Sequence, residues 1–95
     1  MQRIAEGEVI EVAPAETFVI ERRALDGAGY RTSVETPEGV EHIGTGEPVS
    51  RNFGGRPKVE ETFRCTRPGF YEIRFVSGRP WQSATQVVTS KATCR

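Results

Sequence analysis

Glycine and proline interrupt this 95-residue chain along its whole length, with ten glycines and six prolines in all. Both residues mark turns and break helices, so this spacing leaves room only for short elements. Between the turns, apolar and polar residues alternate, which is the pattern of a strand with one face on a core. In the clearest segment, 70–76, this alternation puts Tyr71 and Phe75 on one face. No window keeps an apolar period of 3.6 residues over three turns, so we predict an all-β protein.

The alternating segments also define the expected architecture. Predicted strands cover residues 7–12, 17–23, 30–35, 40–43, 58–66, 70–76 and 84–92, with a further short edge strand near Pro48 and Val49. Seven or eight short strands in one domain, residues 1–95, are typical of an antiparallel immunoglobulin-like β-sandwich, and a small barrel is the alternative. The inner faces are expected to carry Val9, Phe18, Ile20, Val34, Phe63, Tyr71, Ile73, Phe75 and one of Val87 and Val88.

The charge balance limits the classes of partner. Thirteen basic and thirteen acidic residues give a formal net charge of zero, so no overall field draws the protein to nucleic acid or to an anionic membrane. No stretch approaches the roughly 18 apolar residues of a membrane span. The polar start of the sequence differs from a signal peptide, so we expect either a cytoplasmic protein or a processed exported form. We expect a monomer that binds neither nucleic acid nor membrane.

The inventory of reactive side chains argues against an enzyme. His42 is the single histidine, and no nucleophile turn accompanies it, so we interpret it as a strand residue at the sandwich surface. One histidine and two distant cysteines make a poor metal site, and we expect no metal and no cofactor. Cys65 is expected to be buried and Cys94 exposed, while a bridge between them stays open. Glu60 and Glu61 are adjacent on a strand and point to opposite faces, so they are not an acid–base pair.

The remaining candidates for function are loops. In a sandwich, the loops around 25–29, 52–56 and 77–82 should share one end, because they follow alternate strands. Trp81 is the single tryptophan and lies in a loop with Arg79 and Pro80. Exposed tryptophan beside arginine is typical of an interface anchor, and proline reduces the entropy lost on docking. The alternative is that Trp81 folds back as a lid on the end of the sandwich.

These loops carry a resemblance to a known family. The stretch from Thr62-Phe63-Arg64 through Pro68-Gly69-Phe70-Tyr71 to Arg79-Pro80-Trp81 resembles the chagasin-like inhibitors of papain-type cysteine proteases. That family has an immunoglobulin-like sandwich with three inhibitory loops, one of which carries Arg-Pro-Trp or Arg-Pro-Phe. Gly54-Gly55 is similar to the family's glycine-rich loop, and Gly29-Tyr30 matches the end of a third motif, Asn-Pro-Thr-Thr-Gly-Tyr. Residues 25–28 depart from the start of that third motif.

The resemblance implies a reversible, non-covalent inhibitor whose loops wedge into the cleft of a papain-like cysteine protease. Gly27 and Ala28 would lie over the catalytic centre, and Trp81 would stack beside the cleft with Arg79 supporting its loop. The implied protease-binding residues are Asp26, Gly27, Ala28, Gly29, Phe53, Gly54, Gly55, Arg79, Pro80 and Trp81. The alternative is a non-inhibitory interaction module that binds another protein through the same loops, which the departure at 25–28 favours.

Overall fold

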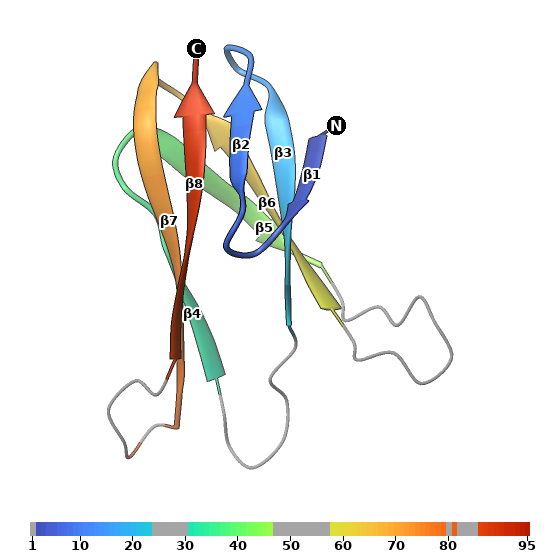
Figure 1. The fold of residues 1–95 in the computed structure, drawn as a ribbon, viewed down its shortest axis with the longest axis vertical. Coiled ribbons are helices and arrows are strands. Elements are labelled where there is room, and N and C mark those ends of the chain that lie inside the picture. The colour runs from blue at the N-terminus through green and yellow to red at the C-terminus, as the bar shows by residue number, and fades with distance from the viewer. Residues whose placement is uncertain (1, 24–30, 47–57, 80, 82–85) are drawn as a thin grey trace.

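The protein is a sandwich of two four-stranded sheets (Figure 1). The computed structural model describes residues 2–23, 31–46, 58–79, 81 and 86–95, and the regular elements in these ranges are all strands. The strands are β1 (Gln2–Ala5), β2 (Val9–Val12), β3 (Thr17–Arg23), β4 (Arg31–Glu35), β5 (Val40–Thr45), β6 (Lys58–Cys65), β7 (Gly69–Gly78) and β8 (Gln86–Cys94). Nothing in these ranges is a helix of the length and apolarity that a membrane span requires.

Each sheet contains one parallel pair at an edge. The first sheet has the order β1-β3-β6-β5 and the second the order β2-β8-β7-β4. β1 runs parallel to β3, and β2 runs parallel to β8, so the chain changes sheets between its first two strands. Gly7 makes that crossing with a φ of 86°, a conformation that suits glycine, and its N–H donates to the buried Ser90 Oγ at 2.8 Å. This bond fastens the crossing to β8.

Seven of the eight strands match segments predicted from the sequence. The boundaries of β3 agree at both ends, and β5 and β7 extend two residues beyond the predicted ends of 40–43 and 70–76. The strand missed is β1, whose residues QRIA show no alternation that would mark a half-buried strand. Tyr30, residues 84–85 and the predicted edge strand near Pro48 lie outside the described residues.

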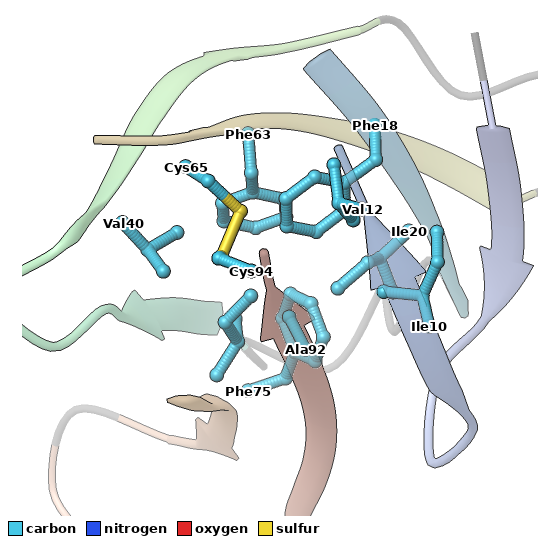
Figure 2. Packing of buried hydrophobic residues seen from close by; sticks show 11 residues of the cluster. Ile10, Val12, Phe18, Ile20, Val40, Phe63, Cys65, Phe75, Ala92 and Cys94 are labelled. Carbon is cyan, nitrogen blue, oxygen red and sulfur yellow. A yellow bond between two sulfur atoms is a disulfide. The ribbon is translucent and has the colours of Figure 1, made fainter. Parts of the chain in front are cut away.

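Three phenylalanines from both sheets form the centre of the core. The Phe18 and Phe63 rings stack with centroids 5.6 Å apart, and Phe75 meets Phe63 edge-on at 6.4 Å. Around them lie apolar side chains of both inner faces, several of which Figure 2 shows: Ile10, Val12, Ile20, Val40, Ile73 and Ala92. Val34 and Tyr71 are partly buried against this cluster, as predicted.

One of the predicted core positions, Val9, needs correction, and one open choice is settled. Val9 is 66% exposed, because β2 aligns Ile10 with Ala92 and turns Ile10 inward. Two apolar residues are adjacent here, so alternation alone could not decide which one faces the core. Of the pair Val87 and Val88, the first is exposed and the second partly buried.

A disulfide between Cys65 and Cys94 joins the two sheets. Each cysteine is the last residue of its strand, β6 in the first sheet and β8 in the second, and the Cα atoms are 5.9 Å apart. The expectation that Cys94 is exposed was wrong: it is 3% exposed, because β2 runs beside the end of β8 and covers it. Figure 2 shows the bridge among the core side chains, with Val40 and Ala92.

Candidate functional site

The three predicted binding loops connect strand ends that lie at one end of the sandwich. Arg23 is opposite Lys58 in the first sheet, and Arg31 is opposite Gly78 in the second. The disulfide joins the ends of β6 and β8, so both strands start on the side of the sandwich away from the bridge. In Figure 1 these strand ends lie on the lower side, away from the C-terminus. We call this end of the molecule the loop end.

Most of the predicted binding residues lie outside the described part of the chain. These are Asp26, Gly27, Ala28, Gly29, Phe53, Gly54, Gly55 and Pro80. Their strands nevertheless fix where each connection starts and finishes: 24–30 joins β3 to β4, 47–57 follows β5, and 80–85 joins β7 to β8. The positions of the strand ends therefore support the expected convergence of the three loops. The positions of the loops themselves stay a prediction.

Trp81 and Arg79 are the predicted binding residues that the structure describes. The Trp81 side chain is 68% exposed, so the indole does not close the sandwich end as a buried lid. The guanidinium carbon of Arg79 lies 5.9 Å from the centroid of the indole ring, within the range of a cation–π interaction. A guanidinium on one face of the ring limits the orientations of the indole and leaves its remaining surface available for contact.

The strand that leads to Arg79 is held by a polar pair inside the sandwich. Ser77 is 4% exposed, and its Oγ lies 2.9 Å from Thr32 Oγ1 on β4. The two residues are directly opposite in the β4–β7 register, so the hydroxyls meet on the inner face. Buried hydroxyls need such partners, and this pair joins β4 to β7 two residues before Arg79.

A second polar group at the loop end has the buried carboxylate of Glu61 at its centre. Arg22 Nε donates to Glu61 Oε2 at 2.7 Å, and His42 Nε2 donates to Oε1 at 2.9 Å. Thr45 Oγ1 also donates to Oε1. We call Glu61, Arg22, His42 and Thr45 the Glu61 cluster. Glu61 itself has no exposed surface, although it carries a charge.

Opposing influences act on the pKa of Glu61. Burial is the largest and raises the pKa, because a carboxylate loses its hydration inside the protein. Hydrogen bonds from Thr45, Arg22 and His42, together with the positive charge of Arg22, lower it. Together these influences lower the pKa of Glu61 below its ordinary value, so the structure holds Glu61 as a carboxylate.

Sequence reasoning found only part of the Glu61 cluster. It placed Glu61 and Glu60 on opposite faces, and Glu60 does bond Arg3 while Glu61 faces inward. The interpretation of His42 as a surface histidine was incomplete, because its ring stacks on Phe63 at 5.0 Å and its side chain is only 28% exposed. A glutamate at an inward strand position was the available signal, since such a charge requires buried partners.

No group of three or more His, Cys, Asp or Glu side chains in the described ranges is arranged to hold a metal ion. At the loop end, the described residues combine two sets of inward-facing polar contacts, the Ser77–Thr32 pair and the Glu61 cluster, with an exposed indole. Such an arrangement suits recognition of another molecule by surface contact.

Comparison with known proteins supports the fold assignment. No protein-family model and no curated protein sequence matches the chain. Among solved structures, the cysteine protease inhibitor EhICP2 from Entamoeba histolytica is similar with a TM-score of 0.70 and 14% identity, over 99% of this chain and 94% of that one. The solution structure of amebosin is similar with a TM-score of 0.71 and 19% identity, over 100% and 99% of the two chains.

The third similar structure contains a protease. PbICP-C in complex with falcipain-2 has a TM-score of 0.56 and 18% identity, and the match covers 99% of this chain and 92% of that one. The fold is that of the chagasin-like inhibitors. At 14–19% identity, the likeness lies in the arrangement of the strands and extends over the whole chain.

Proposed function

We propose that the protein is a reversible, non-covalent inhibitor of papain-family cysteine proteases that acts through its loop end. The observation that carries the proposal is the exposed indole of Trp81, held by Arg79 at the loop end of a fold shared with EhICP2 and with PbICP-C, which was solved bound to falcipain-2. Tryptophan combines a large apolar ring with an N–H donor, which suits contact with a partner protein. Tryptophan and arginine are also the residues most enriched among binding hot spots.

The proposed mechanism is steric. Trp81 would pack on an apolar or aromatic surface beside the protease cleft, with Arg79 limiting the freedom that the indole loses on binding. Gly27 and Ala28 are small enough for close backbone approach to the catalytic cysteine, and Gly54 and Gly55 would contact the other rim. No bond to the protease forms or breaks in this scheme, and the inhibitor needs no catalytic group of its own.

The test is inhibition of papain measured with a fluorogenic peptide substrate. We expect activity to return on dilution, and Trp81→Ala to weaken inhibition by roughly tenfold or more, as loss of a hot spot does. Phe70→Ala is the matched control, because Phe70 is an aromatic residue that is 87% exposed on β7 near the end opposite the loops. It should inhibit like the unmodified protein.

Two outcomes would overturn the proposal. Absence of inhibition at about 100 µM, far weaker than a specific complex requires, would favour the alternative interaction module. Equal losses for Trp81→Ala and Phe70→Ala would show that the loop end has no special part in inhibition.

A further inference from the structure

The Glu61 cluster joins three strands at the positions where two of the proposed binding loops begin and finish. Arg22 is the penultimate residue of β3, and Thr45 is the last residue of β5. Glu61 lies on β6 between them, three residues after that strand begins. The loop with Gly27 and Ala28 follows β3, and the loop with Gly54 and Gly55 joins β5 to β6.

A bulge in β5 brings Thr45 into this cluster. His42 is opposite Phe63 in the register, but Gly44 rather than Ile43 is opposite Thr62, so β5 contains one extra residue. As a result Thr45, and not the preceding glycine, is opposite Glu61. Without the extra residue, Gly44 would face Glu61, and glycine has no side chain with which to bond the carboxylate. The irregularity therefore supplies a hydroxyl donor where the buried charge needs one.

The bonds of this cluster can fix geometry whatever their net contribution to stability. A buried ion pair such as Arg22–Glu61 can often be replaced by apolar residues without loss of stability, because desolvation offsets its attraction. Its bonds are directional, however: Oε2 accepts from β3, while Oε1 accepts from two residues of β5. A carboxylate bonded in this way fixes both neighbouring strands relative to β6 at the loop end.

We propose that Glu61 is a positioning residue of the inhibitory surface: it fixes the ends of β3 and β5, the points from which two of the proposed binding loops leave the sheet. This inference rests on the proposed function. Strand ends that are fixed before binding leave less ordering to be done on binding, so releasing one should lower affinity while the molecule stays folded. The bridge between Cys65 and Cys94 secures the opposite end, so the effect of such a change should stay local.

The test compares four variants by their inhibition constants for papain, each first shown by circular dichroism to be folded. Thr45→Val removes the hydroxyl donor and keeps the shape, whereas Thr45→Ser keeps the donor. Glu61→Gln removes the charge from the centre of the cluster. Glu41→Gln makes the same charge change at an exposed residue of β5 that is paired with Arg64. We expect Thr45→Val and Glu61→Gln to weaken inhibition about tenfold, and Thr45→Ser and Glu41→Gln to change it less than about twofold.

The outcomes separate this inference from the proposed function. If the unmodified protein inhibits papain and Thr45→Val and Glu61→Gln inhibit equally well, the role of Glu61 is overturned and the proposed function stands. If the unmodified protein does not inhibit at all, both are overturned. Thr45 is an exposed residue, so its variants decide the question even if Glu61→Gln fails to fold. An equal loss in Thr45→Ser and Thr45→Val would also contradict the inference, since serine keeps the hydroxyl donor that valine lacks.

Discussion

Cys65 and Cys94 join the last residues of β6 and β8, so that the two sheets are covalently connected at the end opposite the proposed binding loops. The molecule therefore has two different ends. One is closed by a buried bridge within the hydrophobic cluster, and the other has the Glu61 cluster and the Ser77–Thr32 pair near the strand ends that the long connections join. Stability and recognition can be perturbed separately in such an arrangement.

Removing the bridge should lower stability without changing inhibition much. The bridge spans 29 residues, and closing a loop of that size contributes about 3–4 kcal/mol by constraining the unfolded chain. The double variant Cys65→Ala/Cys94→Ala should lose about that free energy of unfolding in urea titrations. Its inhibition constant, measured where it is folded, should stay within about twofold of the original. A large loss of inhibition with the fold intact would show that the two ends are coupled.

Gly39 should tolerate no side chain, because its backbone has a φ of 105° and a Cβ there would collide with the Tyr71 ring. That ring is held in place, since Tyr71 Oη lies 2.9 Å from the carbonyl oxygen of Arg67, to which it donates. We expect Gly39→Ala to lower the free energy of unfolding by about 2–4 kcal/mol from strain and crowding together. Gly44→Ala is the control, because a Cβ at Gly44 meets nothing within 4 Å. Equal effects at the two glycines would contradict this explanation.

The sequence predicted the fold well where alternation was unambiguous. In β7, polar Glu72 and Arg74 separate Tyr71, Ile73 and Phe75, so one assignment of faces satisfied every residue. The predicted burial was wrong where it depended on a contact with a residue far away in the sequence. The burial of Cys94 depends on the parallel pairing with β2, more than 80 residues away, and no local pattern near the C-terminus reports that pairing.

The sequence also predicted only part of the candidate site. The composition of the Trp81 segment indicated an interface anchor, and the indole is indeed exposed, but its exposure could not be separated from a buried lid by sequence alone. Glu60 and Glu61 were correctly placed on opposite faces of their strand, yet the partners of Glu61 could not be named. One of them, Thr45, depends on the one-residue bulge after His42, which decides whether Thr45 or Gly44 faces the carboxylate.

Acid should weaken the fold through Glu61. Its pKa in the folded protein is below the ordinary value of 4.5, so the unfolded chain binds the proton more tightly. The resulting stability is present above that ordinary value and is lost as the pH falls through it toward the folded pKa. The guanidinium of Arg22 faces the carboxylate and would be left without its counter-charge. Between about pH 6 and pH 3, urea titrations should show a larger loss for the unmodified protein than for Glu61→Gln. Identical pH profiles would contradict this.

Arg79 should contribute to inhibition through Trp81 and not independently of it. Its guanidinium lies over the indole at 5.9 Å, and a cation–π contact of this exposed kind is worth about 0.5–1 kcal/mol. Arg79→Ala should therefore weaken papain inhibition by about two- to fivefold, less than Trp81→Ala. Because the arginine acts by orienting the indole, the double variant should be no weaker than Trp81→Ala alone, and a double-mutant cycle measures this. Strictly additive losses would mean that Arg79 contacts the protease directly.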